Sequence, residues 1–218
     1  MATDEGVVTK LGLPQPYSVS SANFIYNLLF CDAPQLFITE EAKADPAWAM
    51  LLGDSTDFDA VRKISDDGDR DSRQRMLAYN LLRKNNQSVP SKVLLGVIFE
   101  VPQKEGLDTL AAFADETVRY INYSGKIGVF EKAPACVVEK CNRVIERAKK
   151  LVNAIGPWEK ARLPPPTRSV RISVLVSDGL YFGEGRYDDL ARDPLGGPVL
   201  AAGVELLMAA TNAGLEKR

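Results

Sequence analysis

The sequence predicts an α+β fold in which a helical N-terminal region, residues 1–89, covers one face of an antiparallel meander sheet. Three observations predict this fold. Apolar residues recur at helical spacing in several segments of the first region. About six short β-rich runs follow, in one group of four and one of two, and short turn sequences join the runs within each group. Grouped strands with short turns indicate antiparallel pairing, whereas a regular strand–helix–strand alternation would indicate a parallel sheet.

Three segments of the N-terminal region have the signals of a helix. The first follows a serine cap near residue 20, and its apolar stripe comprises Phe24, Ile25, Leu28 and Leu29. The second begins at Asp45-Pro46 and turns Trp48 inward, because proline is favoured in the first turn of a helix. The third runs from an acidic or serine cap near residue 71 to about residue 84.

Residues 90–218 hold the predicted sheet and two long helices. The predicted strands comprise 93–101, 107–114, 117–123, 126–131, 170–177 and 180–184. Between the two groups of strands, an apolar stripe of helical period covers 137–155, and Gly156-Pro157 ends it. The final helix, about 198–212, is apolar on all sides except at Glu205, so it must be buried in the core or at a subunit interface. We expect residues 1–218 to form one compact domain.

Hairpin geometry assigns side chains to the two faces of the sheet, because directly opposed residues share a side. Two-residue turns at 115–116 and 124–125 place one apolar set together, namely Ala111, Phe113, Val118, Tyr120, Ile127 and Val129. The opposite face then mixes apolar and cationic groups, with Arg119 among them. In the last hairpin, which turns at Asp178-Gly179, we expect Val174 and Tyr181 to share one side.

The composition is that of a soluble globular protein, with 45% apolar and 26% charged residues. The chain contains no histidine, which excludes every mechanism that needs an imidazole. The net charge of −2 and the isoelectric point of about 5.4 provide no field that attracts phosphate backbones or anionic lipid. We therefore expect no nucleic-acid partner.

The sequence predicts a cytoplasmic protein. No apolar segment is long enough to cross about 30 Å of hydrocarbon, so no membrane association is expected. The acidic N-terminus leads into no apolar segment of signal-peptide type. The three cysteines form no C-x-x-C pair, and reduced thiols are their simplest interpretation.

Common cofactor and metal motifs fail when they are tested against the sequence. Residues 183–185 lack the third glycine of a dinucleotide fingerprint, because Asp188 stands at that position. The acidic segment 66–71 resembles a calcium loop in charge alone, because Lys63 and Gln74 stand where an EF-hand needs acids. No catalytic residue, cofactor or metal is therefore predicted.

Two groups of residues are candidates for ligand binding. The first gathers around the last hairpin and comprises Asp178, Tyr181, Glu184 and Arg186. Carboxylates near tyrosine and arginine can perform acid–base chemistry without histidine, although Asp178-Gly179 is also typical of a plain turn. The second combines Arg119 and Tyr123 on one predicted sheet face, as in surfaces that stack bases. Long cationic side chains packed over a helix explain that pair equally well.

Two segments, 106–131 (GLDTLAAFADETVRYINYSGKIGVFE) and 176–185 (VSDGLYFGEG), resemble stretches in bacterial proteins of no assigned function. That resemblance implies no catalytic residues. In outline, the strand–helix–hairpin–helix order is also similar to the layered-sheet adaptor folds of the profilin, roadblock and longin type.

These observations lead to the hypothesis of a non-catalytic protein that works by binding, either through self-association into a homodimer or by docking to a protein partner. The apolar final helix motivates it. The alternative is a small-molecule enzyme or ligand sensor that uses the carboxylates near Asp178-Gly179. That alternative requires a cleft beside Asp178 or Glu184 and a carboxyl pKa that is raised.

Overall fold

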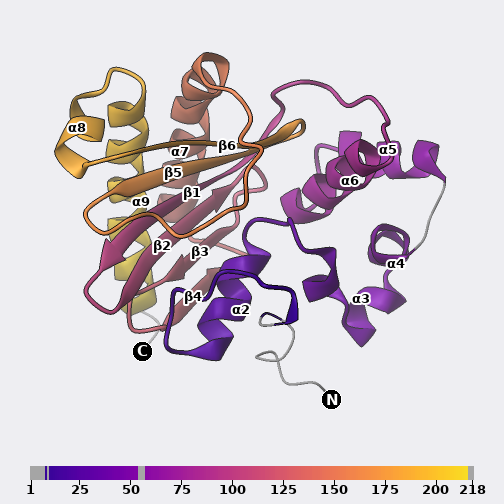
Figure 1. Ribbon diagram of the computed structural model, residues 1–218, viewed down its shortest axis with the longest axis horizontal. Coiled ribbons are helices and arrows are strands. Elements are labelled where there is room, and N and C mark those ends of the chain that lie inside the picture. The colour runs from indigo at the N-terminus through magenta and orange to yellow at the C-terminus, as the bar shows by residue number, and fades with distance from the viewer. Residues whose placement is uncertain (1–7, 9, 54–56, 216–218) are drawn as a thin grey trace.

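The computed structural model describes residues 8, 10–53 and 57–215, and it shows a six-stranded antiparallel sheet between two helical layers (Figure 1). The strands are β1 (Leu94–Gln103), β2 (Gly106–Phe113), β3 (Val118–Ile121), β4 (Ile127–Phe130), β5 (Val170–Val176) and β6 (Gly179–Gly185). Their order across the sheet is β4-β3-β2-β1-β5-β6, and each neighbouring pair is antiparallel. The predicted α+β fold is confirmed.

Two long helices cover one face of the sheet. The first four strands form a meander, and α7 (Ala135–Ala154) returns the chain so that β5 pairs with the free side of β1. The second helix, α9 (Gly196–Leu215), packs beside α7 (Figure 1). The core on this face includes Val97, Phe99, Val144, Ala148, Ile172, Val174 and Leu206.

The N-terminal helices cover the opposite face, as the sequence predicts (Figure 1). They are α2 (Ser20–Leu28), η1 (Pro34–Phe37, a 3₁₀ turn), α3 (Glu40–Ala44), α4 (Pro46–Leu52), α5 (Phe58–Asp66) and α6 (Ser72–Lys84). The core on this face includes Tyr26, Phe30, Met76, Leu77, Leu95, Ile98 and Phe113. Because the alternate side chains of β1 enter different cores, one sheet joins the two helical layers.

Three short helices lie in polar segments where the sequence predicted none: α3, α5 and α8 (Tyr187–Arg192). Side-chain caps explain two of them. Thr39 accepts a hydrogen bond from the Ala42 amide at the start of α3, and Asp57 accepts one from the Ala60 amide at the start of α5. Val61 and Ile64 then anchor α5 in the N-terminal core.

The predicted face assignment of the first two hairpins is wrong by one residue. The Phe113 amide donates to the Thr117 carbonyl, and the Asn122 amide donates to the Lys126 carbonyl, so each loop has three residues, 114–116 and 123–125. The third loop residue is left-handed in both, with φ of 67° at Glu116 and 82° at Gly125. Because side chains alternate along a strand, this slip reverses which residues share a face.

The sequence predicted that Ala111, Phe113 and Val118 share one face of the sheet, but the observed register places Val118 on the face opposite to the other two. Leu110, Ala112, Val118 and Phe130 pack under α7 and α9, whereas Ala111, Phe113 and Ile121 face the N-terminal helices. In the last hairpin Val174 pairs with Tyr181, so the predicted sharing of a side is confirmed there. Its turn lies one residue earlier, with Val176 opposite Gly179.

Buried polar contacts join the N-terminal layer to the sheet. The hydroxyl of Tyr17 lies 2.7 Å from that of Thr109, and the Tyr26 hydroxyl donates to the Glu100 carboxylate at 2.6 Å. From the connector between α7 and β5, Arg162 donates to Asp32 through Nε at 2.9 Å. These contacts satisfy polar groups that would otherwise be buried without partners.

The core covers only part of the final helix, so the expectation that it is buried in the core holds for one side, and burial of the other side at a subunit interface stays a prediction. Val199 and Leu206 are buried, but Val204 is 39% and Met208 is 63% exposed. Within the described residues, every helix is too short or too polar to span a lipid bilayer.

Candidate functional site

A groove of about 440 Å³ opens in the N-terminal layer between α2, η1, α3 and α4. Its walls are mainly apolar and comprise Phe24, Leu28, Leu36, Phe37, Ala42 and Trp48. Thr39, Glu41 and Asp45 add polar groups to the lining, and Arg73 from α6 reaches it as a cation. We call this cavity the aromatic groove.

The orientation of α2 brings apolar side chains to the groove. Its buried side carries Asn23 and Asn27, and the apolar stripe predicted for the core is only partly covered. The Asn23 side chain accepts from the Tyr17 amide at 2.9 Å and donates to the Tyr17 carbonyl at 2.8 Å. The Asn23 side chain can be buried because Tyr17, in the loop before α2, satisfies its hydrogen bonds. With the asparagine side of α2 turned inward, Phe24 lines the groove.

The opposite wall is built by η1 and α4. Pro34 opens the 3₁₀ turn, and the Asp45 carboxylate caps α4 by accepting from the Ala47 and Trp48 amides. The rings of Phe37 and Trp48 stack with centroids 5.3 Å apart and an interplanar angle of 18°. This offset stack gives the groove a rigid aromatic surface.

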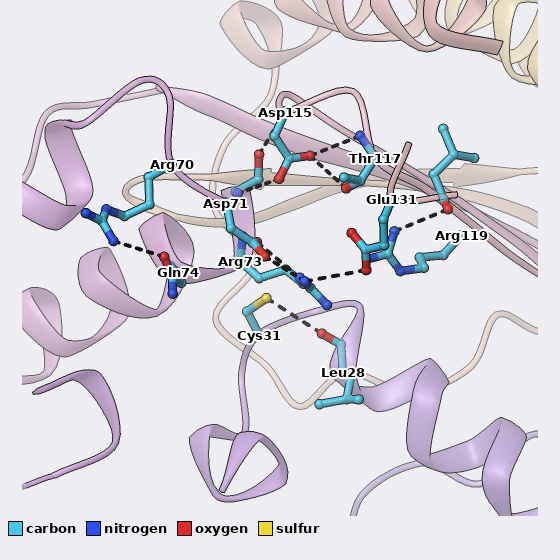
Figure 2. A network of polar contacts seen from close by, with 12 residues as sticks. Leu28, Cys31, Arg70, Asp71, Arg73, Gln74, Asp115, Thr117, Arg119 and Glu131 are labelled. Atoms are coloured by element: carbon cyan, nitrogen blue, oxygen red, sulfur yellow. Dashed lines mark hydrogen bonds and ion pairs between the residues drawn. The ribbon is translucent and has the colours of Figure 1, made fainter. Parts of the chain in front are cut away.

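A network of charges surrounds Arg73 (Figure 2). Its guanidinium donates to the Asp71 carboxylate at 2.6 Å and lies 3.9 Å from Glu131. Burial acts to raise the pKa of Asp71, but the hydrogen bonds and charge of Arg73 outweigh it, so the pKa is lowered. Both groups stay ionised at neutral pH, and the positive charge that reaches the groove is largely compensated.

Arg119 belongs to the same network but lies deeper. It is 4% exposed, and its Nη2 donates to Glu131 at 2.5 Å (Figure 2). Burial, and then the neighbouring charge of Arg73, lower the pKa of Arg119. Glu131, which is about half exposed, therefore joins two cations at the edge of the sheet.

The groups next to this network have structural roles. The Asp115 carboxylate accepts from the Ser72 amide at 2.7 Å, and Ser72 Oγ accepts from the Asp115 amide at 3.1 Å, which ties the β2–β3 loop to the start of α6. Cys31 is fully buried, and its thiol donates to the Leu28 carbonyl (Figure 2). Burial raises the pKa of Cys31, which disfavours the thiolate, the nucleophilic form of the group.

The structure divides the predicted group at the last hairpin. Asp178 accepts from the Ser91 hydroxyl at 2.7 Å, the Lys92 amide at 3.1 Å and the Tyr181 hydroxyl at 3.1 Å. Burial acts to raise the pKa of Asp178, but these hydrogen bonds lower it overall. The contacts of Asp178 fasten the last hairpin to residues 91–92, which precede β1, and the pKa is shifted in the direction opposite to the one that the enzyme alternative requires.

The other two members of that group lie away from Asp178. Glu184, at the far end of β6, accepts from Arg171 Nε at 2.8 Å. Arg186 is exposed and lines a separate hollow of about 320 Å³ with Arg168, Tyr187 and Asp188. The four residues therefore do not converge on one site.

The second predicted pair is separated as well. Arg119 points into the interface with the N-terminal layer, whereas Tyr123 lies in the β3–β4 loop and is 48% exposed. The two side chains form no common surface, because β3 ends at Ile121 and Tyr123 belongs to the loop 123–125. Tyr123 donates its amide to Asp108 at 3.0 Å, a contact that fastens the loop.

The residues of the aromatic groove were not predicted as a site. Their signal is present in the sequence as apolar stripes in two short N-terminal helices, but such stripes are also typical of core packing. The structure shows that α2 packs on the side that carries Asn23 and Asn27, which leaves Phe24 and Leu28 of the apolar stripe in the wall of the groove. Among the described residues, no group of three or more carboxylates and thiols is arranged to hold a metal ion.

Comparisons of this chain with protein-family models, with curated proteins and with solved structures find no match. A function for this chain must therefore be inferred from the geometry and the chemistry of its surface. Among its described lining residues the aromatic groove is mainly apolar, its one cation is paired with a carboxylate, and the Glu41 carboxylate is exposed. Such a site can bind apolar side chains and a positive charge.

Proposed function

We propose that this protein acts by binding another protein, and that the aromatic groove accepts a partner segment that carries apolar and basic side chains. The observation that supports this proposal is an open groove with a stacked Phe37–Trp48 pair. Large aromatic side chains in such surfaces supply most of the binding energy when a partner covers them.

The charges around the groove favour a basic partner. Arg73 is already paired with Asp71, so it offers little to an anion. Glu41 lines the groove and forms no ion pair or hydrogen bond with any described residue. A lysine or arginine of the partner would complement this carboxylate.

The groove can be tested with the natural fluorescence of Trp48. The chain has two tryptophans, so Trp158→Phe leaves Trp48 as the only reporter. We expect a synthetic amphipathic peptide of leucine and lysine to change its fluorescence saturably. A leucine–glutamate peptide of the same pattern should not. Equal effects of the two peptides, or no effect of either, would contradict the proposal.

A matched pair of charge reversals locates the binding site. Glu41→Lys, in the groove, should weaken the leucine–lysine peptide by about threefold to tenfold, the range of a partly exposed ion pair. Glu40→Lys is the control, because Glu40 lies next to it in α3 but pairs with Lys43 outside the groove. If both reversals weaken binding equally, the peptide recognises only net charge.

Self-association is a second candidate, and the exposed side of α9 favours it. Val204 and Met208 lie on that side, and Glu205 beside them contacts Lys140 and Arg143. A surface with both signs of charge around an apolar strip can meet a second copy across a twofold axis. We expect a dimer by light scattering at tens of micromolar and a monomer for Met208→Lys. A wild-type monomer would exclude this candidate.

A further inference from the structure

A second cavity lies on the other side of η1 from the aromatic groove and has a volume of about 590 Å³. Its apolar walls come from η1, α4 and α6 and include Ile38, Leu52, Leu77 and Leu81. The last turn of α6 adds Arg83 and Lys84, so we call it the basic cavity.

Arg83 is incompletely partnered. Its Nη2 donates to the neutral side chain of Asn80, and its Nε is buried without a hydrogen-bond partner. Within the part of the chain that the structure describes, no carboxylate lies within ion-pair distance of Arg83. Burial lowers the pKa of Arg83, although the charges of Asp178 and Tyr181 act against it. The guanidinium is partly buried and its Nε lacks a hydrogen-bond partner, a cost that a bound anion would relieve.

Among the described lining residues of the basic cavity, the one carboxylate is already compensated. Asp32 accepts from Arg162 Nε at 2.9 Å and from Arg162 Nη2 at 3.3 Å. The charge that the cavity presents to a ligand is therefore positive, from Arg83 inside and from Lys84, which is exposed.

We propose that the basic cavity binds an aliphatic monocarboxylate, with its carboxylate on Arg83 and its hydrocarbon chain along the leucine-lined walls. The planar guanidinium matches a carboxylate, and the Asn80 amide lies beside it. One carboxylate neutralises the partly buried Arg83, whereas Lys84 is exposed and can stay hydrated. The aliphatic part of the lining, with Ile38, Leu52, Leu77 and Leu81, favours a hydrocarbon body.

The probe for this site is sodium decanoate, used below its micelle concentration and measured by isothermal titration calorimetry. We expect saturable binding of one decanoate per chain. Decan-1-ol has the same chain without the charge, and acetate has the charge without the chain; both should bind at least about tenfold more weakly. An absence of decanoate binding, or equal binding of decanol, would overturn the proposal.

Substitution of the guanidinium tests the position of the carboxylate. Arg83→Met keeps a side chain of similar length and should weaken decanoate binding by about tenfold to a hundredfold. The control is Arg147→Met, which makes the same change of charge on the exposed side of α7, across the sheet. Retention of wild-type affinity in Arg83→Met would exclude this site. Circular dichroism verifies that each variant folds, and the comparison of decanoate with decanol on the wild type tests the proposal without any variant.

This inference is independent of the proposed protein partner. The two cavities lie on different sides of η1 and share no lining residue. Decanoate binding with an inert aromatic groove, or the reverse, would therefore separate the two proposals.

Discussion

At the scale of single residues, the buried charges of this protein gather where the N-terminal layer meets the sheet. Glu100 lies in β1 and is fully buried, and the residue directly opposite it in β5 is Arg171. Arg171 in turn pairs with Glu184 of β6, through Nε at 2.8 Å. A row of alternating charge therefore crosses three strands, and cross-strand pairs of opposite charge stabilise a sheet.

Glu100 makes the stability of the protein depend on pH. Burial raises its pKa, although the hydrogen bond from Tyr26 and the charges of Arg171 and Arg162 act against this. The folded protein therefore binds this proton more tightly than the unfolded chain does, and its stability falls as the pH rises above the ordinary carboxyl value of 4.5. Glu100→Gln should remove this loss, because the amide oxygen still accepts from Tyr26 without carrying a charge.

Urea unfolding of both proteins between pH 4.5 and pH 8 measures this effect, and the range starts at the ordinary pKa of the group. Glu105→Gln, in the exposed β1–β2 turn, is the matched control and should keep the wild-type profile. If Glu100→Gln follows the wild-type profile as well, another group is responsible for the pH dependence.

At the scale of elements, the packing of α9 on the sheet depends on one glycine. A Cβ atom at Gly203 would lie 2.7 Å from the ring of Phe99 in β1. The helix can approach this strand closely because the side chain is absent. Gly214, in the same helix, has no heavy atom within 4 Å of the corresponding position.

Gly203→Ala should therefore destabilise the protein by about 1–3 kcal/mol, the usual range for overpacking a core. Gly214→Ala is its matched control and should be neutral or stabilising by up to about 1 kcal/mol, because alanine is the better helix former. The free energy of unfolding of the two variants measures the difference. Equal effects would mean that the close approach of α9 to β1 contributes little to stability.

At the scale of the whole molecule, the sheet is shared by two cores. Ile98 and Ala111 contact the N-terminal helices, whereas Val97 and Ala112 contact the layer of α7 and α9. Neither layer can keep its core if the strands separate, so we expect the protein to unfold in one cooperative transition.

The two tryptophans test this cooperativity, because one lies in the N-terminal helices and the other packs on the edge strand β6 of the sheet. Trp48 lies in α4, and Trp158 packs on Phe182 of β6 with ring centroids 4.5 Å apart. In Trp158→Phe and in Trp48→Phe, the fluorescence and far-UV circular dichroism midpoints in urea should coincide. A fluorescence transition that precedes the loss of helicity in either variant would show that the region around the remaining tryptophan unfolds separately.

The sequence by itself determined the kinds of elements and their order. Alternating apolar residues and turn sequences predicted the six strands, and the stripe over 137–155 predicted α7, because these signals arise from neighbours along the chain. Proline and acidic caps likewise predicted α4 and α6. Local signals are sufficient where the interactions that form an element are themselves local.

The tertiary structure decided which faces meet and which stay open. Glu116 adopts a left-handed backbone that its residue type does not predict, and this one residue changed the register so that Ala111 of β2 lies opposite Arg119. Asn23 and Asn27 are buried on α2 because backbone groups outside the helix satisfy them, which leaves Phe24 in the aromatic groove. These outcomes depend on partners outside the element concerned, so its local pattern cannot predict them.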